Sequence, residues 1–180
     1  FFPTTTSERV LAYFLGIGWD GGAAGLLARL TTHQGGLPQG APTSPHLSNL
    51  VIAPLDARLQ ATSLRFGATY TRYADDLTFS FESDERASIA AVIRCTQSVV
   101  ADYGYKLHTK KKLRLARRHQ RMVVTGLVVN DGVNLPRETR RKLRAVRHHL
   151  ATGRPATMTA AQLAGWEAFE LMVLAWADKN

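Results

Sequence analysis

The sequence predicts an α+β fold, in which an antiparallel sheet carries helices on one face and a small helical unit follows. Three observations support this class. Residues on both sides of Asp75 and Asp76 are rich in aromatic and β-branched side chains, which is typical of paired strands. Residues 86–103 repeat apolar side chains at helical spacing, and from Pro136 onward the pattern is helical throughout. We therefore divide the chain into a sheet-containing domain, 1–133, and a helical unit, 134–180.

Composition fits a globular protein. The chain has 180 residues with 45% hydrophobic and 21% charged side chains, enough for one core and a small appended domain. A single cysteine, Cys95, excludes an internal disulfide, and the six histidines lack the spacing of metal ligands, so no zinc site is expected. No signal peptide and no long uninterrupted apolar run is present. We expect a cytoplasmic protein with no membrane partner.

Positive charge is concentrated in one part of the chain. The net charge is +9, and fourteen of the 23 Lys and Arg residues lie between Lys106 and Arg147. Only Asp131 and Glu138 oppose them in that stretch. Such a stretch favours a polyanionic partner, above all a nucleic acid.

The first part of the chain predicts two short helices and a stiff loop. The helices cover residues 7–15 and 23–30, and their apolar positions at helical spacing are Val10, Leu11 and Phe14 in the first and Leu26, Leu27 and Leu30 in the second. Prolines stiffen the loop over residues 37–45, and Gly40 lets its backbone approach a flat ligand closely. We expect a helix after the loop, with Ser44 as its cap and Pro45 at its first position.

The acidic pair Asp75–Asp76 is predicted to lie in the turn of a β-hairpin. The residues from Leu77 to Phe81 alternate apolar with polar, which indicates a half-buried strand after the turn. Adjacent carboxylates repel each other, and a divalent cation relieves that repulsion; hard oxygen ligands suit Mg²⁺, with Mn²⁺ as an alternative. The competing interpretation is an ordinary solvated turn.

The helical unit begins at Pro136. Leu143, Val146 and Leu150 lie on one side of its first helix, and a cationic face lies opposite. The members of that face are Arg137, Arg140, Arg141, Arg144, Arg147 and His148. Thr159 and Gln162 form a capping box for the last helix. We expect that helix to pack on the preceding one, and its remaining apolar surface to allow self-association.

Several motifs occur together in a characteristic order. They are Leu37-Pro38-Gln39-Gly40-Ala41-Pro42-Thr43-Ser44-Pro45, Tyr73-Ala74-Asp75-Asp76, Gly104-Tyr105-Lys106-Leu107, Lys110-Lys111-Lys112 and Val124-Thr125-Gly126-Leu127-Val128-Val129-Asn130. In this order and spacing they resemble the bacterial reverse transcriptases of the group II intron-like superfamily, most closely the retron type. The resemblance covers nearly the whole chain. One departure is His108, where the family commonly has Asn.

The resemblance implies a polymerase palm over 1–133 and a helical thumb over 134–180, with the fingers absent. It also implies RNA-directed DNA synthesis, in which two divalent metals promote transfer of a nucleotidyl group from a dNTP to a primer 3′-hydroxyl, with pyrophosphate as the leaving group. The expected partners are a template and primer, as RNA or an RNA/DNA hybrid, and a cognate structured non-coding RNA; the expected biology is anti-phage defence. The family places a further catalytic Asp shortly before Phe1. We therefore expect a fragment of a longer protein that is inactive alone.

Site residues follow from the resemblance residue by residue. Asp75 is the first candidate for metal ligand and Asp76 the second, and Lys111 matches the lysine proposed to protonate the leaving pyrophosphate, although either neighbouring lysine could take its place. The implied substrate-binding residues are Phe2, Gln39, Gly40 and Tyr73. Phe1 and Phe2 would end a strand, with Phe2 closing on the sugar 2′ position.

Nucleic-acid backbone contacts are assigned to arginines of two segments. Arg117, Arg118 and Arg121 lie near the Val-Thr-Gly motif, and the others are those of the cationic helix face, Arg137, Arg140, Arg141, Arg144 and Arg147. Two alternatives stay open. One is a group II intron-like or other defence-associated reverse transcriptase. The other is a non-catalytic RNA-binding fragment.

Overall fold

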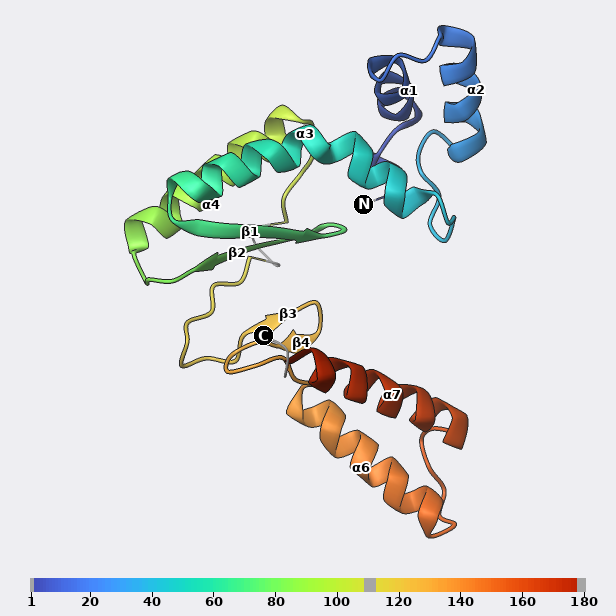
Figure 1. Cartoon of the computed structure of the whole chain (residues 1–180), viewed down its shortest axis with the longest axis vertical. Helices are drawn as coiled ribbons and strands as arrows, with labels where there is room; N and C mark the ends of the chain where they lie inside the picture. The colour runs from blue at the N-terminus through green and yellow to red at the C-terminus, as the bar shows by residue number, and fades with distance from the viewer. Residues whose placement is uncertain (1, 109–112, 178–180) are drawn as a thin grey trace. The chain divides into compact units, whose positions relative to one another are not determined.

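The computed structural model describes residues 2–108 and 113–177. The chain divides into two compact units, Phe1–Leu113 and Arg114–Asn180 (Figure 1). Each unit has a hydrophobic core of its own. The fold is α+β, as predicted: the described residues form two small antiparallel sheets and six α-helices. This division falls inside the segment assigned above to the palm, and the palm and thumb assignments stay predictions.

Two packed helices open the first unit. They are α1, Ser7–Gly16, and α2, Gly21–Thr31. Val10 of α1 and the alanines Ala24 and Ala28 of α2 are buried. Two of the apolar positions of the second predicted helix, Leu26 and Leu30, are 53% and 73% exposed. The small alanine side chains face the core instead, which lets the two helices approach closely.

The start of the chain also departs from expectation. Phe2 opens a short 3-10 turn, Phe2–Thr4, and does not end a strand. The amide of Thr5 donates to the Phe2 carbonyl at 3.0 Å, which closes the turn. Pro3 favours this geometry because its ring fixes φ and it has no amide hydrogen for a ladder. The Phe2 ring packs against the core around Val10.

The stiff loop leads into a long helix, α3, Ser44–Arg65. Ser44 is the first helical residue and not the cap, which is Thr43. The buried Ser44 hydroxyl donates to the Pro38 carbonyl at 2.6 Å and so closes the loop. It therefore does not cap the first amides of the helix. Leu47 and Leu55 of α3 face the core.

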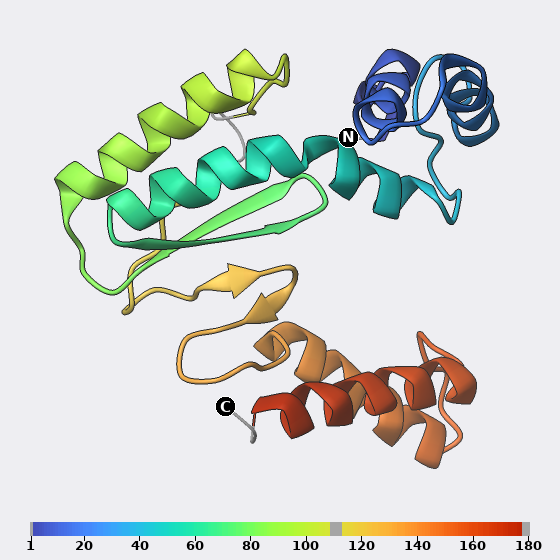
Figure 2. The ribbon, with the colours of Figure 1, turned by 45° about the horizontal axis from the view of Figure 1, so that its top comes forward.

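The predicted β-hairpin is confirmed. Strand β1, Ala68–Tyr73, pairs antiparallel with β2, Asp76–Phe81. Helix α4, Arg86–Asp102, follows and ends before Gly104, which has a φ of 69°. Two views show α3 and α4 on the same side of the hairpin (Figures 1 and 2). The core between these elements consists of Leu55, Leu59, Tyr70, Val99 and Val100.

The second unit begins with a minimal hairpin. Strand β3, Val123–Val124, pairs antiparallel with β4, Leu127–Val128. Both turn residues have positive φ, 47° at Thr125 and 85° at Gly126, as a tight two-residue turn of this hand requires.

Two helices complete the second unit. Helix α6, Arg137–Ala151, packs against α7, Ala160–Ala177, around Leu135, Leu143, Val146 and Leu163. The capping box is confirmed: the Thr159 amide donates to Gln162 Oε1 at 3.0 Å, and the Gln162 amide donates to Thr159 Oγ1 at 3.2 Å. Within residues 2–108 and 113–177, no helix combines the length and hydrophobicity needed to cross a membrane.

Candidate active site

The acidic pair lies at the tip of the β1–β2 hairpin. Tyr73 pairs with Asp76 as the last rung of the ladder, so Ala74 and Asp75 form the turn itself. Ala74 has a φ of 51°, a value that residues other than glycine rarely adopt. The tight turn therefore places two carboxylates next to each other at an exposed end of the sheet.

The two faces of the hairpin differ sharply. Successive side chains of a strand point to opposite faces. Ala68, Tyr70 and Arg72 face α3, whereas Tyr73 and Asp76 belong to the other face. That face also carries Thr69, Thr71, Thr78 and Ser80, and no described helix of the first unit covers it. Tyr73 is 70% exposed there, beside the acidic turn.

The residues present fit part of a divalent cation site. Asp75 and Asp76 are exposed oxygen donors, and Mg²⁺ usually keeps several waters while binding one or two carboxylates. Among the residues that the structure describes, no three His, Cys, Asp or Glu side chains gather closely enough to enclose a metal. The turn thus supplies two ligands, and a complete two-metal site needs further oxygen donors.

The other predicted substrate residues lie in different places. Gln39 and Gly40 are exposed in the loop before α3, and Gly40 has a φ of 86°, which explains glycine at that position. Phe2 is half-buried against the core around Val10. Lys111 falls outside the described residues, as do Lys110 and Lys112.

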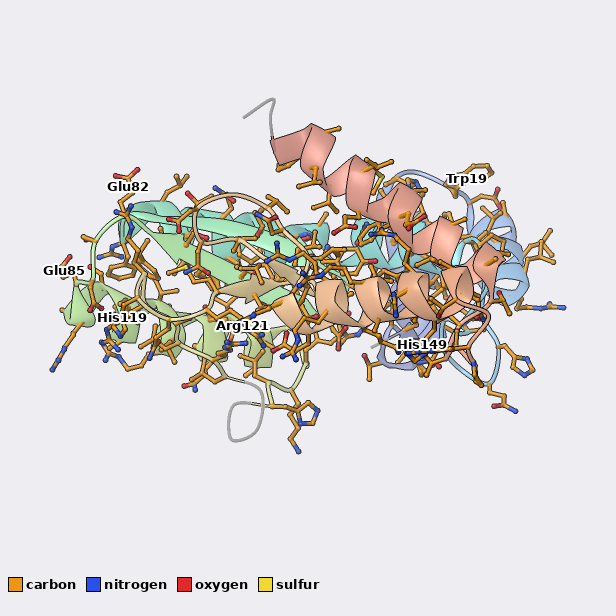
Figure 3. All side chains as sticks on the ribbon, turned by 90° about the horizontal axis from the view of Figure 1, so that it is seen from below. Trp19, Glu82, Glu85, His119, Arg121 and His149 are labelled. Atoms are coloured by element: carbon orange, nitrogen blue, oxygen red, sulfur yellow. The ribbon has the colours of Figure 1, made fainter. Side chains whose placement is uncertain are left out.

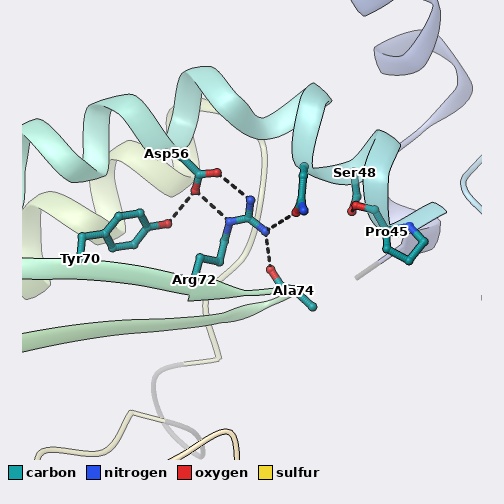
Figure 4. Close-up of polar contacts among 7 residues, drawn as sticks. Pro45, Ser48, Asp56, Tyr70, Arg72 and Ala74 are labelled. Atoms are coloured by element: carbon teal, nitrogen blue, oxygen red, sulfur yellow. Dashed lines mark hydrogen bonds and ion pairs between the residues drawn. The ribbon is translucent and has the colours of Figure 1, made fainter. Parts of the chain in front are cut away.

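A hydrogen-bond network behind the turn was not foreseen from the sequence. Asp56 of α3 accepts hydrogen bonds from the Tyr70 hydroxyl at 2.7 Å and from Arg72 at 2.8 and 2.6 Å (Figure 4). Arg72 also donates to Asn49 and to the Ala74 carbonyl. One indication of this network was present in the sequence: Arg72 is a charged residue at a strand position whose side chain points to the buried face.

Burial and charge act together on this network. Burial of Tyr70 and its hydrogen bond to Asp56 raise the pKa of the tyrosine hydroxyl well above its ordinary value. The hydrogen bond to Asp56 likewise raises the pKa of Arg72. Both groups therefore keep their protons throughout the neutral range.

Most of the predicted nucleic-acid-binding arginines are exposed, and two of them form ion pairs. Arg121, labelled in Figure 3, contacts Glu138 at 2.7 and 2.9 Å, and Arg147 contacts Glu167 at 2.7 Å. The backbone hydrogen bond of Glu138, followed by its bond from Arg121, lowers the pKa of that carboxylate. Arg118 is exposed and Arg117 half-buried in the loop before β3.

The cationic face of α6 lines a depression. Arg137, Arg140, Arg144 and Arg147 contribute to it together with Leu143 of the same helix and Glu170 of α7. Arg141 is exposed on the same helix. The four arginines that line the depression are spaced three or four residues apart, so their positive charges lie along one side of α6.

Comparison with known proteins decides the family. The family model described as reverse transcriptase (RNA-dependent DNA polymerase) matches residues 5–129, well over half of the chain. The chain belongs to the reverse transcriptase family. The match includes the stiff loop, α3 and the acidic hairpin, so the two segments predicted to form the active site both lie within it.

Retron reverse transcriptases are among its relatives. The chain is 36% identical to the retron Mx162 reverse transcriptase of Myxococcus xanthus, over 94% of this chain and 42% of that protein. It is 35% identical to the retron Ec86 reverse transcriptase of Escherichia coli, over 96% of this chain and 53% of that protein. The chain is also 36% identical to the retron Mx65 reverse transcriptase of Myxococcus xanthus, over 96% of this chain and 44% of that protein. The chain thus spans about half the length of these curated relatives.

Proposed function

We propose that the protein is a retron-type RNA-directed DNA polymerase whose acidic turn binds the catalytic divalent cations. The observation that carries this proposal is the exposed Asp75–Asp76 turn at the tip of a hairpin, in a chain of the reverse transcriptase family. When bound, Mg²⁺ would activate the primer 3′-hydroxyl and stabilise the charge that develops on the phosphates. In this proposal residues 1–133 form the palm, and residues 134–180, with α6 and α7, form the thumb.

Each predicted residue then has a distinct role. Asp75 and Asp76 hold the cations. Tyr73 lies beside them on the uncovered face, where a primer end or incoming nucleotide would pack against its ring. Gln39 and Gly40 would contact the nucleotide from the loop before α3, and Phe2 would close on its sugar. Lys111 stays the candidate proton donor for pyrophosphate.

The arginines of α6 would bind phosphates of the template and primer, as an RNA or hybrid duplex. Cationic side chains that succeed each other along one helix face suit a polyanionic backbone, which they recognise without reading sequence. A structured non-coding RNA as the template, and a role in anti-phage defence, belong to the proposal because the relatives are retron enzymes.

Primer extension on an RNA template tests the proposal in the intact protein. Asp75→Asn should lower the rate in Mg²⁺ by about a hundredfold or more, because it removes a charged metal ligand. RNA affinity should change little. Glu82→Gln is the matched control: it also removes one exposed carboxylate, but just beyond the strand end opposite the turn. Undiminished synthesis by Asp75→Asn would refute the assignment.

A further inference from the structure

The side chain of Arg72 connects three parts of the first unit. Its Nε and Nη2 donate to the carboxylate of Asp56 at 2.8 and 2.6 Å. Its Nη1 donates to Asn49 Oδ1 at 3.1 Å and to the main-chain carbonyl of Ala74 at 3.0 Å (Figure 4). The arginine side chain is only 9% exposed, whereas its partner Asn49 lies at an exposed position of α3.

The contact with Ala74 acts on the acidic turn directly. The Ala74 carbonyl belongs to the peptide that joins Ala74 to Asp75, so the hydrogen bond from Arg72 restrains the plane of that peptide. Ala74 needs this restraint, because a φ of 51° costs an alanine about 1–2 kcal/mol relative to the right-handed region. Arg72 thus stabilises an unfavourable backbone conformation immediately before the first acidic residue.

The contacts of Arg72 with α3 connect the acidic turn to the loop that carries Gln39. Asn49 and Asp56 lie about two helical turns apart and so share one face of α3. At its first turn the same helix is bonded to the loop, through the Ser44 hydroxyl and the Pro38 carbonyl next to Gln39. One continuous helix, which contains Pro54, therefore joins the loop that carries Gln39 to the turn that carries Asp75.

We infer that Arg72, oriented by Asp56, is a positioning residue for the acidic turn. It fixes the peptide before Asp75 relative to α3, so that the carboxylates meet a divalent cation without first reordering the turn. The expected effect on primer extension rests on the proposed function. The expected effect on divalent-cation binding depends only on the Asp75–Asp76 turn.

The alternative is that the network serves stability alone. A buried ion pair commonly contributes little net stability compared with apolar residues of similar volume, while removal of one partner is strongly destabilising. A loss of activity in proportion to a loss of folded protein would therefore say nothing about positioning. Tyr70 offers a matched control, because Tyr70→Phe removes a hydrogen bond to Asp56 and leaves every contact of the turn in place.

The experiment compares Arg72→Lys with Tyr70→Phe in the intact protein, and circular dichroism checks that both fold. Lysine keeps the charge but lacks the planar fork, so it cannot reach Asp56, Asn49 and Ala74 together. Titration with Mn²⁺, followed by water-proton relaxation, measures binding at the turn without turnover, with Asp75→Asn as the reference for loss of the site. The Mn²⁺ dissociation constant should rise about tenfold in Arg72→Lys and stay unchanged in Tyr70→Phe.

Primer extension supplies the second readout. The Mg²⁺ concentration for half-maximal rate should rise in Arg72→Lys in parallel with the Mn²⁺ constant, while the dissociation constant for template and primer stays the same. If Arg72→Lys does not fold, Asn49→Ala takes its place, since it removes one partner of the same guanidinium nitrogen from an exposed helical position. It should weaken Mn²⁺ binding in the same direction by a smaller factor.

The outcomes separate this inference from the proposed function. Mn²⁺ affinity in Arg72→Lys equal to that of the unmodified protein would overturn the inference, and so would the absence of Asp75-dependent Mn²⁺ binding in the unmodified protein. If Mn²⁺ binding changes as expected but no primer is extended, the proposed polymerase activity fails and the positioning role stands. If primers are extended and both variants behave alike, the activity stands and the positioning role fails.

Discussion

At the scale of single residues, Tyr70 predicts a pH dependence of stability. Burial and the hydrogen bond to Asp56 raise its pKa above the ordinary 10.0, so the native state keeps a proton that the unfolded chain loses above that pH. The stability contributed by the hydroxyl is therefore fully present below pH 10.0 and decreases above it. Tyr70→Phe should unfold about 1 kcal/mol more easily at neutral pH, and this difference should shrink as the pH rises.

Urea unfolding at a series of pH values on both sides of 10.0 measures that difference. The comparison isolates Tyr70, because the two proteins share every other side chain. Tyr73→Phe is the control, since the Tyr73 side chain is 70% exposed and its loss should give a small, constant difference. A difference for Tyr70→Phe that stays constant above pH 10.0 would contradict the argument.

At the scale of elements, the spacing of residues along the chain predicted the buried faces of two helices and one helix cap. The stripe of α4 and the apolar side of α6 were predicted from spacing, and the capping box of α7 from two residues three positions apart. The exposure of Leu26 and Leu30 could not be predicted, because periodicity cannot tell which face of an apolar helix meets its neighbour. Ser44 was misassigned because its hydroxyl bonds a carbonyl outside the helix, an interaction set by how the loop folds back.

The basic face of α6 predicts a strong salt dependence of RNA binding. Each phosphate contact releases counterions, so replacing Arg137, Arg140 and Arg144 together with Ala should flatten the slope of log affinity against log salt. The slope should change by about 0.7–0.9 for each phosphate that is no longer neutralised. Fluorescence anisotropy with a labelled RNA or hybrid duplex, over a range of salt concentrations, measures this slope.

A charge-matched control separates the face from net charge. Arg29, Arg86 and Arg94 are exposed positions on helices of the first unit, and their replacement with Ala removes the same three charges. This control should lower affinity slightly and leave the slope nearly unchanged. Equal slopes for the two triple variants would mean that α6 contributes only to overall charge.

At the scale of the whole molecule, the sequence predicted the position of the acidic turn but not the hydrogen bonds that stabilise it. The turn was predictable because its strands and carboxylates are contiguous in the chain. The network of Asn49, Asp56, Tyr70 and Arg72 joins a helix to a strand, and no local pattern specifies such pairings. In the same way, the contact between Arg121 and Glu138 depends on how β3, β4 and α6 fold together within the second unit.

The last prediction concerns residues 1–180 as an isolated polypeptide, which should bind RNA without extending a primer. The two-metal mechanism needs carboxylates that bridge both cations, and Asp75 and Asp76 share one turn. Among the described residues no third acidic side chain gathers with them. Asp20 precedes α2 and accepts the Gly22 and Ala23 amides as its cap, so it is engaged elsewhere.

Primer extension on an RNA template, with RNA binding measured in parallel, tests this prediction. The isolated chain is compared with a longer polypeptide, extended upstream by the segment that the family resemblance places before Phe1. The longer polypeptide should synthesise DNA and lose that activity on Asp75→Asn, because the family resemblance implies a further catalytic Asp upstream. Synthesis by residues 1–180 alone, lost on Asp75→Asn, would show that a carboxylate within this chain completes the site.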